Sequence, residues 1–148
     1  MQAQMLAPAA VLVVWTLIML GWAAMLRIPA LKKIGGLAKA PPGGRGQDLE
    51  GVLDPKINWK SHNYSHLVEQ PTVFYPTVVI LAMMGATGLD VTLAWIYVAL
   101  RIAHSLWQAM VNVVAVRFVI FFASTLVLLT LAIRAVMLTL FAQSGVAV

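Results

Sequence analysis

The sequence contains no cysteine and very few charged residues. Asp, Glu, Lys and Arg make up 10% of its 148 residues, whereas about 25% is usual for a soluble domain. Without cysteine the protein has no disulfide bond, no thiolate metal ligand and no thiol nucleophile of its own. Any thiol chemistry must therefore use a thiol that a ligand supplies. The shortage of charge, together with 61% hydrophobic residues, indicates a membrane protein.

The hydrophobic residues gather into four long runs separated by polar segments or short turns. A helix crosses a bilayer in about 20 apolar residues, so four spans use more than half of the chain. Little is left for a further domain, and helices joined by short turns pack antiparallel. We therefore expect a single all-α domain over residues 1–148, an antiparallel bundle of four transmembrane helices with spans at about 5–26, 63–84, 91–114 and 117–141.

Seven of the ten Lys and Arg residues lie between Arg27 and Lys60. The sequence has no RNP-like motif, zinc-finger spacing or interleaved aromatic stripe, so we expect no nucleic-acid binding. By the positive-inside rule this basic segment is a cytoplasmic loop, which places both termini outside. Its glycines and prolines predict a flexible connector over about 27–60. They do not form a phosphate-binding loop, because no Gly-Lys-Ser/Thr ending follows them.

Two charged residues away from this loop have simple structural interpretations. Asp90 follows a glycine-containing turn, and we expect it to be the N-cap of the third helix. Arg134 lies 17 residues beyond Arg117, which is about 25 Å along a helix and reaches the outer interface. We expect its guanidinium to extend toward the headgroups there.

Polar side chains form a stripe on each of two spans. At about 100° per residue, five polar residues of the third span fall within about 100° of arc around the helix: Arg101, His104, Ser105, Gln108 and Asn112. If the second helix begins early enough, four more share a face of it: His62, Ser65, His66 and Glu69. The expected topology places both stripes, with Arg27 and Arg117, in the cytoplasmic half of the membrane.

Ionisable groups inside a bilayer need a partner, water or a ligand, because each costs about 2.5 to 3.5 kcal/mol at mid-membrane. One interpretation is bonding between helices, with Arg101 paired to Glu69. The other is a site for a small anionic ligand, in which Glu69 binds an ammonium and the arginines bind carboxylates. An arginine beside a thiol would also favour the thiolate. The spacing of the histidines and Glu69 matches no metal motif, so we expect no metal site.

Two segments carry a resemblance to a known family: HLVEQPTVFY at residues 66–75 and YVALRIAHS at residues 97–105, followed by Asn112 and Arg117-Phe118. With them, nearly the whole chain resembles the MAPEG family, the membrane-associated proteins of eicosanoid and glutathione metabolism. The resemblance implies a homotrimer of four-helix membrane bundles, with glutathione bound as co-substrate between subunits near the cytosolic side. Family members of known activity are glutathione transferases, glutathione peroxidases or eicosanoid synthases. The motifs look like those of bacterial members, which implies the inner membrane.

The resemblance also implies roles for individual residues. Arg117 is similar to an arginine implicated in stabilising the glutathione thiolate, so we expect it to be the catalytic residue. Six others are expected to bind glutathione: Arg27, His66, Glu69, Arg101, His104 and Gln108. His66 stands where well-studied members have asparagine, and Gln108 replaces a tyrosine that contacts glutathione in several members.

Three functional hypotheses follow. The first is a membrane-embedded, glutathione-dependent enzyme of transferase or peroxidase type, acting on a lipophilic small molecule that reaches it through membrane lipid. The second is a non-catalytic membrane protein that binds a lipid or an anionic metabolite. The third, a transporter or proton relay, is disfavoured because no comparable polar stripe continues toward the outer face on the first and fourth spans.

Overall fold

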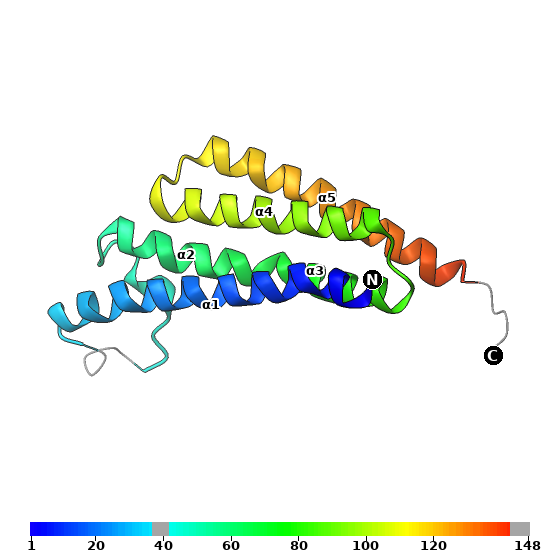
Figure 1. Ribbon diagram of the computed structural model, residues 1–148. Helices are drawn as coiled ribbons and strands as arrows, with labels where there is room; N and C mark the ends of the chain where they lie inside the picture. The colour runs from blue at the N-terminus through cyan, green and yellow to red at the C-terminus, as the bar shows by residue number, and fades with distance from the viewer. Residues whose placement is uncertain (37–41, 143–148) are drawn as a thin grey trace.

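The computed structural model describes residues 1–36 and 42–142, and every regular element in them is helical. The expected flexible connector includes residues 37–41, which lie outside the described residues. The elements are, in chain order, α1 (Gln2–Lys33), the 3-10 turn η2 (Gly46–Leu49), α2 (Pro55–Glu69), α3 (Pro71–Met83), α4 (Gly88–Met110) and α5 (Val114–Leu140). Helices α2 and α3 lie end to end, so the bundle has four rods (Figure 1). The all-α prediction is confirmed.

Three of the helices are long and apolar enough to cross a membrane: α1, α4 and α5. Their outer faces expose large hydrophobic side chains such as Leu17, Met25, Phe122 and Leu129. A surface of this kind fits lipid, which solvates apolar side chains as well as a protein core does. The second rod differs, because α2 has 15 residues and α3 has 13. The chain is therefore a membrane protein in which one rod is divided.

The division of the second rod comes from Pro71. Proline has no N–H to donate to the carbonyl four residues earlier, and its ring crowds that turn of the helix. The local hydrogen bonds change accordingly: Val73 N donates to Gln70 O at 3.0 Å, and Thr72 Oγ1 donates to Glu69 O at 2.5 Å. The segment that we expected to be one span at about 63–84 consists of the last part of α2 and all of α3.

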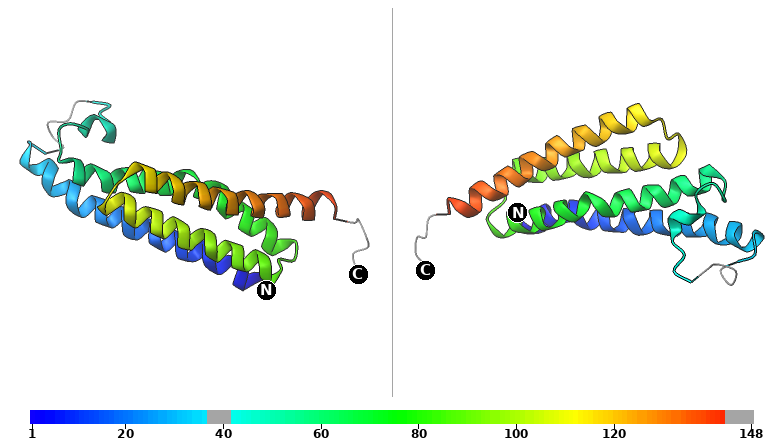
Figure 2. Two further views of the ribbon diagram at one scale, coloured as in Figure 1. Left: turned by 90° about the horizontal axis from the view of Figure 1, so that it is seen from above. Right: turned by 180° about the vertical axis from the view of Figure 1, so that it is seen from behind.

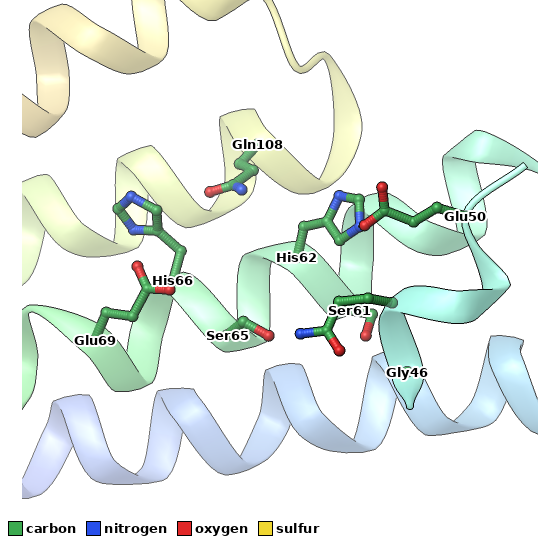
Figure 3. A pocket seen from close by; sticks show the side chains of 9 residues that line it. Gly46, Glu50, Ser61, His62, Ser65, His66, Glu69 and Gln108 are labelled. Carbon is green, nitrogen blue, oxygen red and sulfur yellow. The ribbon is translucent and has the colours of Figure 1, made fainter. Parts of the chain in front are cut away.

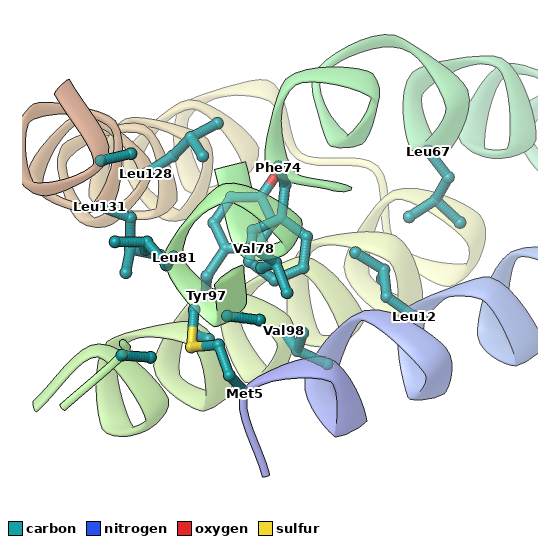
Figure 4. Packing of buried hydrophobic residues seen from close by; sticks show 14 of the residues in the cluster. Met5, Leu12, Leu67, Phe74, Val78, Leu81, Tyr97, Val98, Leu128 and Leu131 are labelled. Carbon is teal, nitrogen blue, oxygen red and sulfur yellow. The ribbon is translucent and has the colours of Figure 1, made fainter. Parts of the chain in front are cut away.

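Gln70 ties this break to the other half of the bundle. Its Oε1 accepts a hydrogen bond from the Tyr97 hydroxyl of α4 at 3.2 Å, and its Nε2 donates to Thr125 Oγ1 of α5 at 2.8 Å. Next to it the Tyr97 and Phe74 rings stack with centroids 4.3 Å apart. The apolar core continues from this stack through fully buried residues of all four rods, among them Leu12, Val78, Leu81 and Leu131 (Figure 4). The break is thus held on both sides by packed helices.

The two ends of the bundle differ in what they hold. The N-terminus, the α3–α4 turn and the end of α5 lie at one end (Figures 1 and 2). The end of α1, η2, the start of α2 and the α4–α5 turn lie at the other. Both polar stripes point toward this second end, which we call the loop end. Its assignment to the cytoplasm stays a prediction.

At the opposite end, the structure corrects the prediction for Asp90 and adds a partner for Arg134. Thr87 is the N-cap of α4 and Asp90 is its third residue, with Asp90 Oδ2 accepting from the Thr87 N–H at 2.7 Å. The carboxylate is fully buried because Arg134 of α5 binds it through Nε and Nη2. Asp90 is therefore no N-cap. Arg134 pairs with it, and the position of Arg134 at the membrane interface stays a prediction. Sequence reasoning missed the pair because 44 residues separate its members.

The ion pair makes a prediction about stability. Changing Arg134 to methionine leaves the buried Asp90 carboxylate without its cation. Breaking a fully buried pair costs about 3–5 kcal/mol, and the cost is smaller here because the Arg134 side chain is partly exposed. We expect Arg134→Met to lower the unfolding temperature of the detergent-purified protein, followed by circular dichroism. The double variant with Asp90→Asn should recover much of this loss, because no charge is then left unpaired. A single variant as stable as the wild type would contradict the role of the pair.

Candidate functional site

The polar stripe of α4 faces into the bundle. Four of its five predicted members are buried: Arg101, His104, Ser105 and Gln108. The helical phase calculated from the sequence is therefore correct over these two turns. The fifth, Asn112, lies beyond the end of α4 and has a positive φ of 58°. It belongs to the α4–α5 turn, where asparagine tolerates the left-handed conformation better than most residues.

Arg101 binds the last turn of α2. Its Nη2 donates to the His66 carbonyl oxygen at 2.8 Å and lies 3.1 Å from His66 Nδ1. The last four carbonyls of a helix lack donors from within the helix, and Arg101 supplies one from outside. The Arg101–Glu69 pair that we considered from the sequence is not formed, because the Glu69 side chain lies on the exposed side of α2.

Ser105 joins three helices. Its Oγ accepts hydrogen bonds from Trp15 Nε1 of α1 at 3.1 Å and from Asn63 Nδ2 of α2 at 2.9 Å. Asn63 is 1% exposed and was not among the predicted site residues. Its position three residues before His66 places it on the same face of α2, so helical spacing alone contained the signal.

His66 and His104 stack on each other beside this junction. Their ring centroids are 4.7 Å apart with an interplanar angle of 28°. The Phe121 ring of α5 meets His66 edge-on at 5.2 Å. Two imidazoles from different helices therefore form the wall of the site, and an aromatic ring from a third helix supports it.

Arg117 begins the opposite wall of the site. Its Nη1 donates to Asn112 Oδ1, so the side chain of the turn orients the guanidinium. Arg117 is partly exposed and lines a cavity of about 210 Å³ with His66, His104, Val114, Phe118 and Phe121. We call this the arginine cavity. Arginine, imidazole and aromatic rings around one space suit an anionic group bound next to an apolar one.

A second, larger cavity of about 470 Å³ lies on the other side of His66. Its lining comes from the loop, α2 and α4: Gly46, Gln47, Glu50, Ser61, His62, Ser65, His66, Glu69 and Gln108 (Figure 3). We call this the polar cavity. It contains three of the six residues that we expected to bind glutathione, namely His66, Glu69 and Gln108. His66 belongs to both cavities and marks their junction.

Arg27 shapes the polar cavity without lining it. Its Nη1 donates to Ser61 Oγ at 2.5 Å and its Nη2 donates to the Gly46 carbonyl oxygen. A Cβ atom at residue 46 would lie 3.3 Å from Arg27 Nη1, so glycine lets the loop approach closely. The sequence indicated that Arg27 reaches this end of the bundle. It did not indicate that the guanidinium would bind the Gly46 carbonyl oxygen of the loop.

The loop forms one rim of the polar cavity. Glu50 Oε1 lies 3.0 Å from His62 Nε2, and Asn58 Nδ2 donates to the Leu49 carbonyl oxygen at 3.1 Å. Both bonds join the loop to α2. They position Glu50 across the opening from Glu69, as Figure 3 shows. Within residues 1–36 and 42–142 no group of three or more metal-ligating side chains occurs.

The similarity of the chain to known proteins lies at the family level. The model of the MAPEG family matches residues 5–137, which is nearly the whole chain. The chain belongs to the MAPEG family. No curated protein and no solved structure matches it.

Several buried polar groups of this MAPEG protein have no partner among the described residues. They are Arg101 Nε and Nη1, Asn63 Oδ1, Gln108 Oε1, and the Nε atoms of Arg27 and Arg117. All of them lie at the loop end, around the two cavities. Buried polar groups without partners cost about 1–3 kcal/mol each. A ligand or a further chain that supplied hydrogen-bond partners would therefore stabilise this end of the MAPEG fold most.

The contact between Arg101 and His66 makes a second prediction. Lysine ends in a compact ammonium on a shorter side chain, so Arg101→Lys does not place a donor where Nη2 meets the His66 carbonyl oxygen and Nδ1. We expect this variant to lose about 1–3 kcal/mol of unfolding free energy. The same substitution at the exposed Arg45 serves as the control and should leave stability unchanged. Equal thermal unfolding of both variants would contradict a bridging role for Arg101.

Proposed function

We propose that this MAPEG protein is a membrane-embedded, glutathione-dependent enzyme of transferase or peroxidase type that acts on lipophilic electrophiles. The observation that carries the proposal is the junction of the two cavities at His66. One cavity offers carboxylates, hydroxyls and amides, and the other offers Arg117. A peptide with a thiol needs both kinds of surrounding.

The polar cavity suits the peptide part of glutathione. Its ammonium group would lie between Glu50 and Glu69, which supply negative charge at the rim. The peptide groups would bond with Ser61, Ser65 and the Gln108 amide, whose Oε1 has no partner among the described residues. Charge-assisted hydrogen bonds of this kind are the stronger ones in proteins.

The arginine cavity suits the thiol. A cation within about 4–6 Å favours the ionised form of a neighbouring acid. Arg117 would therefore lower the pKa of a bound thiol and raise the fraction of thiolate, which is the nucleophile. Because Asn112 already holds the guanidinium, less side-chain freedom is lost when the thiolate binds.

The lipophilic substrate would enter from the membrane. Phe118 and Val114 line the arginine cavity and are 64% and 68% exposed on the outside of α5. An apolar molecule dissolved in lipid could therefore reach the thiolate without crossing water. This arrangement supports an enzyme for hydrophobic electrophiles and does not select one of them.

We also propose a homotrimer in the inner membrane, with both termini outside. Support comes from an apolar groove of about 340 Å³ on α1 and α4, lined by Ala10, Val11, Val14, Trp15, Ile18 and Ile102. A neighbouring helix would fill such a groove better than lipid chains.

Native mass spectrometry of the detergent-purified protein tests the trimer and should give three times the mass of one chain. A monomeric mass in several mild detergents would contradict the trimer.

A non-catalytic binding protein is the second candidate. His66 lines both cavities and stacks on His104, which lines only the arginine cavity; these rings could separate a peptide in the polar cavity from Arg117, which favours this candidate. If the rings keep a bound peptide away from Arg117, the protein binds its ligand without turnover. Saturable glutathione binding with no consumption of any electrophile or hydroperoxide would support this candidate against the enzyme.

The enzyme proposal is tested by measuring how much thiolate forms when glutathione binds. Adding glutathione to the purified wild type should produce the ultraviolet absorbance of a thiolate near neutral pH. Arg117→Ala should remove most of this signal, because the cation that stabilises the thiolate is gone. Lys33→Ala is the matched control. It removes one positive charge from the same end of the bundle and lies outside both cavities, so its signal should equal that of the wild type. An unchanged signal in Arg117→Ala would refute the role of Arg117.

A further inference from the structure

The two ring nitrogens of His66 have different surroundings. Nδ1 lies 3.1 Å from Nη2 of Arg101, and the same Nη2 donates to the His66 carbonyl oxygen at 2.8 Å. A guanidinium has five N–H donors, no acceptor, and stays protonated in proteins. The nitrogen that faces it must therefore accept. In a neutral imidazole one nitrogen accepts and the other carries the hydrogen, so the hydrogen of His66 is on Nε2.

The surroundings hold the ring in this orientation. Arg101 has no exposed surface, and its Nη2 is fixed by a main-chain oxygen that cannot rotate away. The His104 ring stacks on one face of His66, and Phe121 meets it edge-on. A 180° flip of the ring would keep both aromatic contacts but would break the contact between Nδ1 and Arg101. The tautomer is therefore set by the fold.

Nε2 is left for a ligand. Within residues 1–36 and 42–142, no side chain or carbonyl forms a hydrogen bond with it, and His66 lines both the polar and the arginine cavity. His104 has no comparable constraint, since no arginine or other described residue forms a hydrogen bond with its ring. The two stacked imidazoles therefore differ: the hydrogen of His66 is assigned to Nε2, whereas neither nitrogen of His104 is assigned as the donor.

We propose that His66 is a hydrogen-bond donor of fixed tautomer, whose Nε2–H binds an acceptor atom of the ligand at the junction of the two cavities. Arg101 is the positioning residue that fixes the tautomer. The ligand group bound there is a carboxylate, a carbonyl oxygen or a thiolate, and ammonium groups are rejected because they only donate. His66 therefore selects by hydrogen-bond polarity. The inference rests on the proposed function only in taking glutathione as the peptide that binds.

The tautomer is tested without any ligand. Protein labelled with ¹⁵N-histidine is studied in detergent by two-bond nitrogen–proton correlation at neutral pH, with the His66 signals assigned by their loss in His66→Gln. We expect a pyridine-like Nδ1 and a protonated Nε2 in the wild type. Arg101→Met removes the donor that faces Nδ1 and should shift the His66 signals toward a tautomer mixture, while those of His62 stay in place. A protonated Nδ1 in the wild type would overturn the proposal.

The donor is tested with glutathione sulfonate, in which an anionic acceptor replaces the thiol, by isothermal titration calorimetry. His66→Leu removes the donor and should weaken binding at least about tenfold, since a hydrogen bond to a charged group is lost. His66→Gln keeps an N–H at a similar reach and should recover most of the affinity. His62→Gln is the control for losing a histidine at this end.

The outcomes separate the two proposals. Equal binding by the wild type and His66→Leu would overturn the donor role while leaving the proposed function standing. No binding to the wild type would overturn the proposed function and the ligand-binding half of this inference, whereas the spectra still decide the tautomer. Weak binding by both His66→Leu and His66→Gln would contradict selection by an N–H donor and indicate that only the imidazole shape matters.

Discussion

Arg101 is a permanently charged side chain with no exposed surface, on a helix apolar enough to cross a membrane. Such a charge persists only where its hydrogen-bonding groups find partners. It finds one at the end of α2, and α2 ends where it does because Pro71 cannot continue the hydrogen bonds of the helix. The buried arginine therefore depends on the break in the second rod. Together they set the position of His66, and through it the place where the two cavities meet.

The two ends of the bundle differ in how completely their buried polar groups are hydrogen-bonded. At the end opposite the loop, the buried carboxylate of Asp90 is paired with Arg134 and accepts hydrogen bonds from Thr87. At the loop end, by contrast, Arg101 and Gln108 keep buried polar atoms that have no hydrogen-bond partner among the described residues. A chain with one satisfied and one unsatisfied polar end is stabilised at the first and can bind at the second.

Much of this could be predicted from the sequence, for reasons that individual residues make clear. The hydrophobic runs predicted the all-α class. The helical period of 3.6 residues correctly predicted that four residues face the interior: Arg101, His104, Ser105 and Gln108. Both predictions succeeded because they use local signals. The break at Pro71 was only partly visible, since proline also occurs within intact membrane helices. Partners from distant segments were not predictable. Helical phase says which way Arg101 points, but it does not say whether His66 or Glu69 meets it. Arg134 and Asp90 show the same limit.

The central claim is that the polar and arginine cavities form one ligand site joined at His66. Hydrogen–deuterium exchange with and without glutathione tests it most directly, because the amides at the loop, the end of α2 and the start of α5 report on both cavities at once. The account predicts slower exchange over residues 46–69 and also over residues 112–118, with no change around Asp90. Protection confined to one of the two segments, or absent from both at millimolar glutathione, would contradict it.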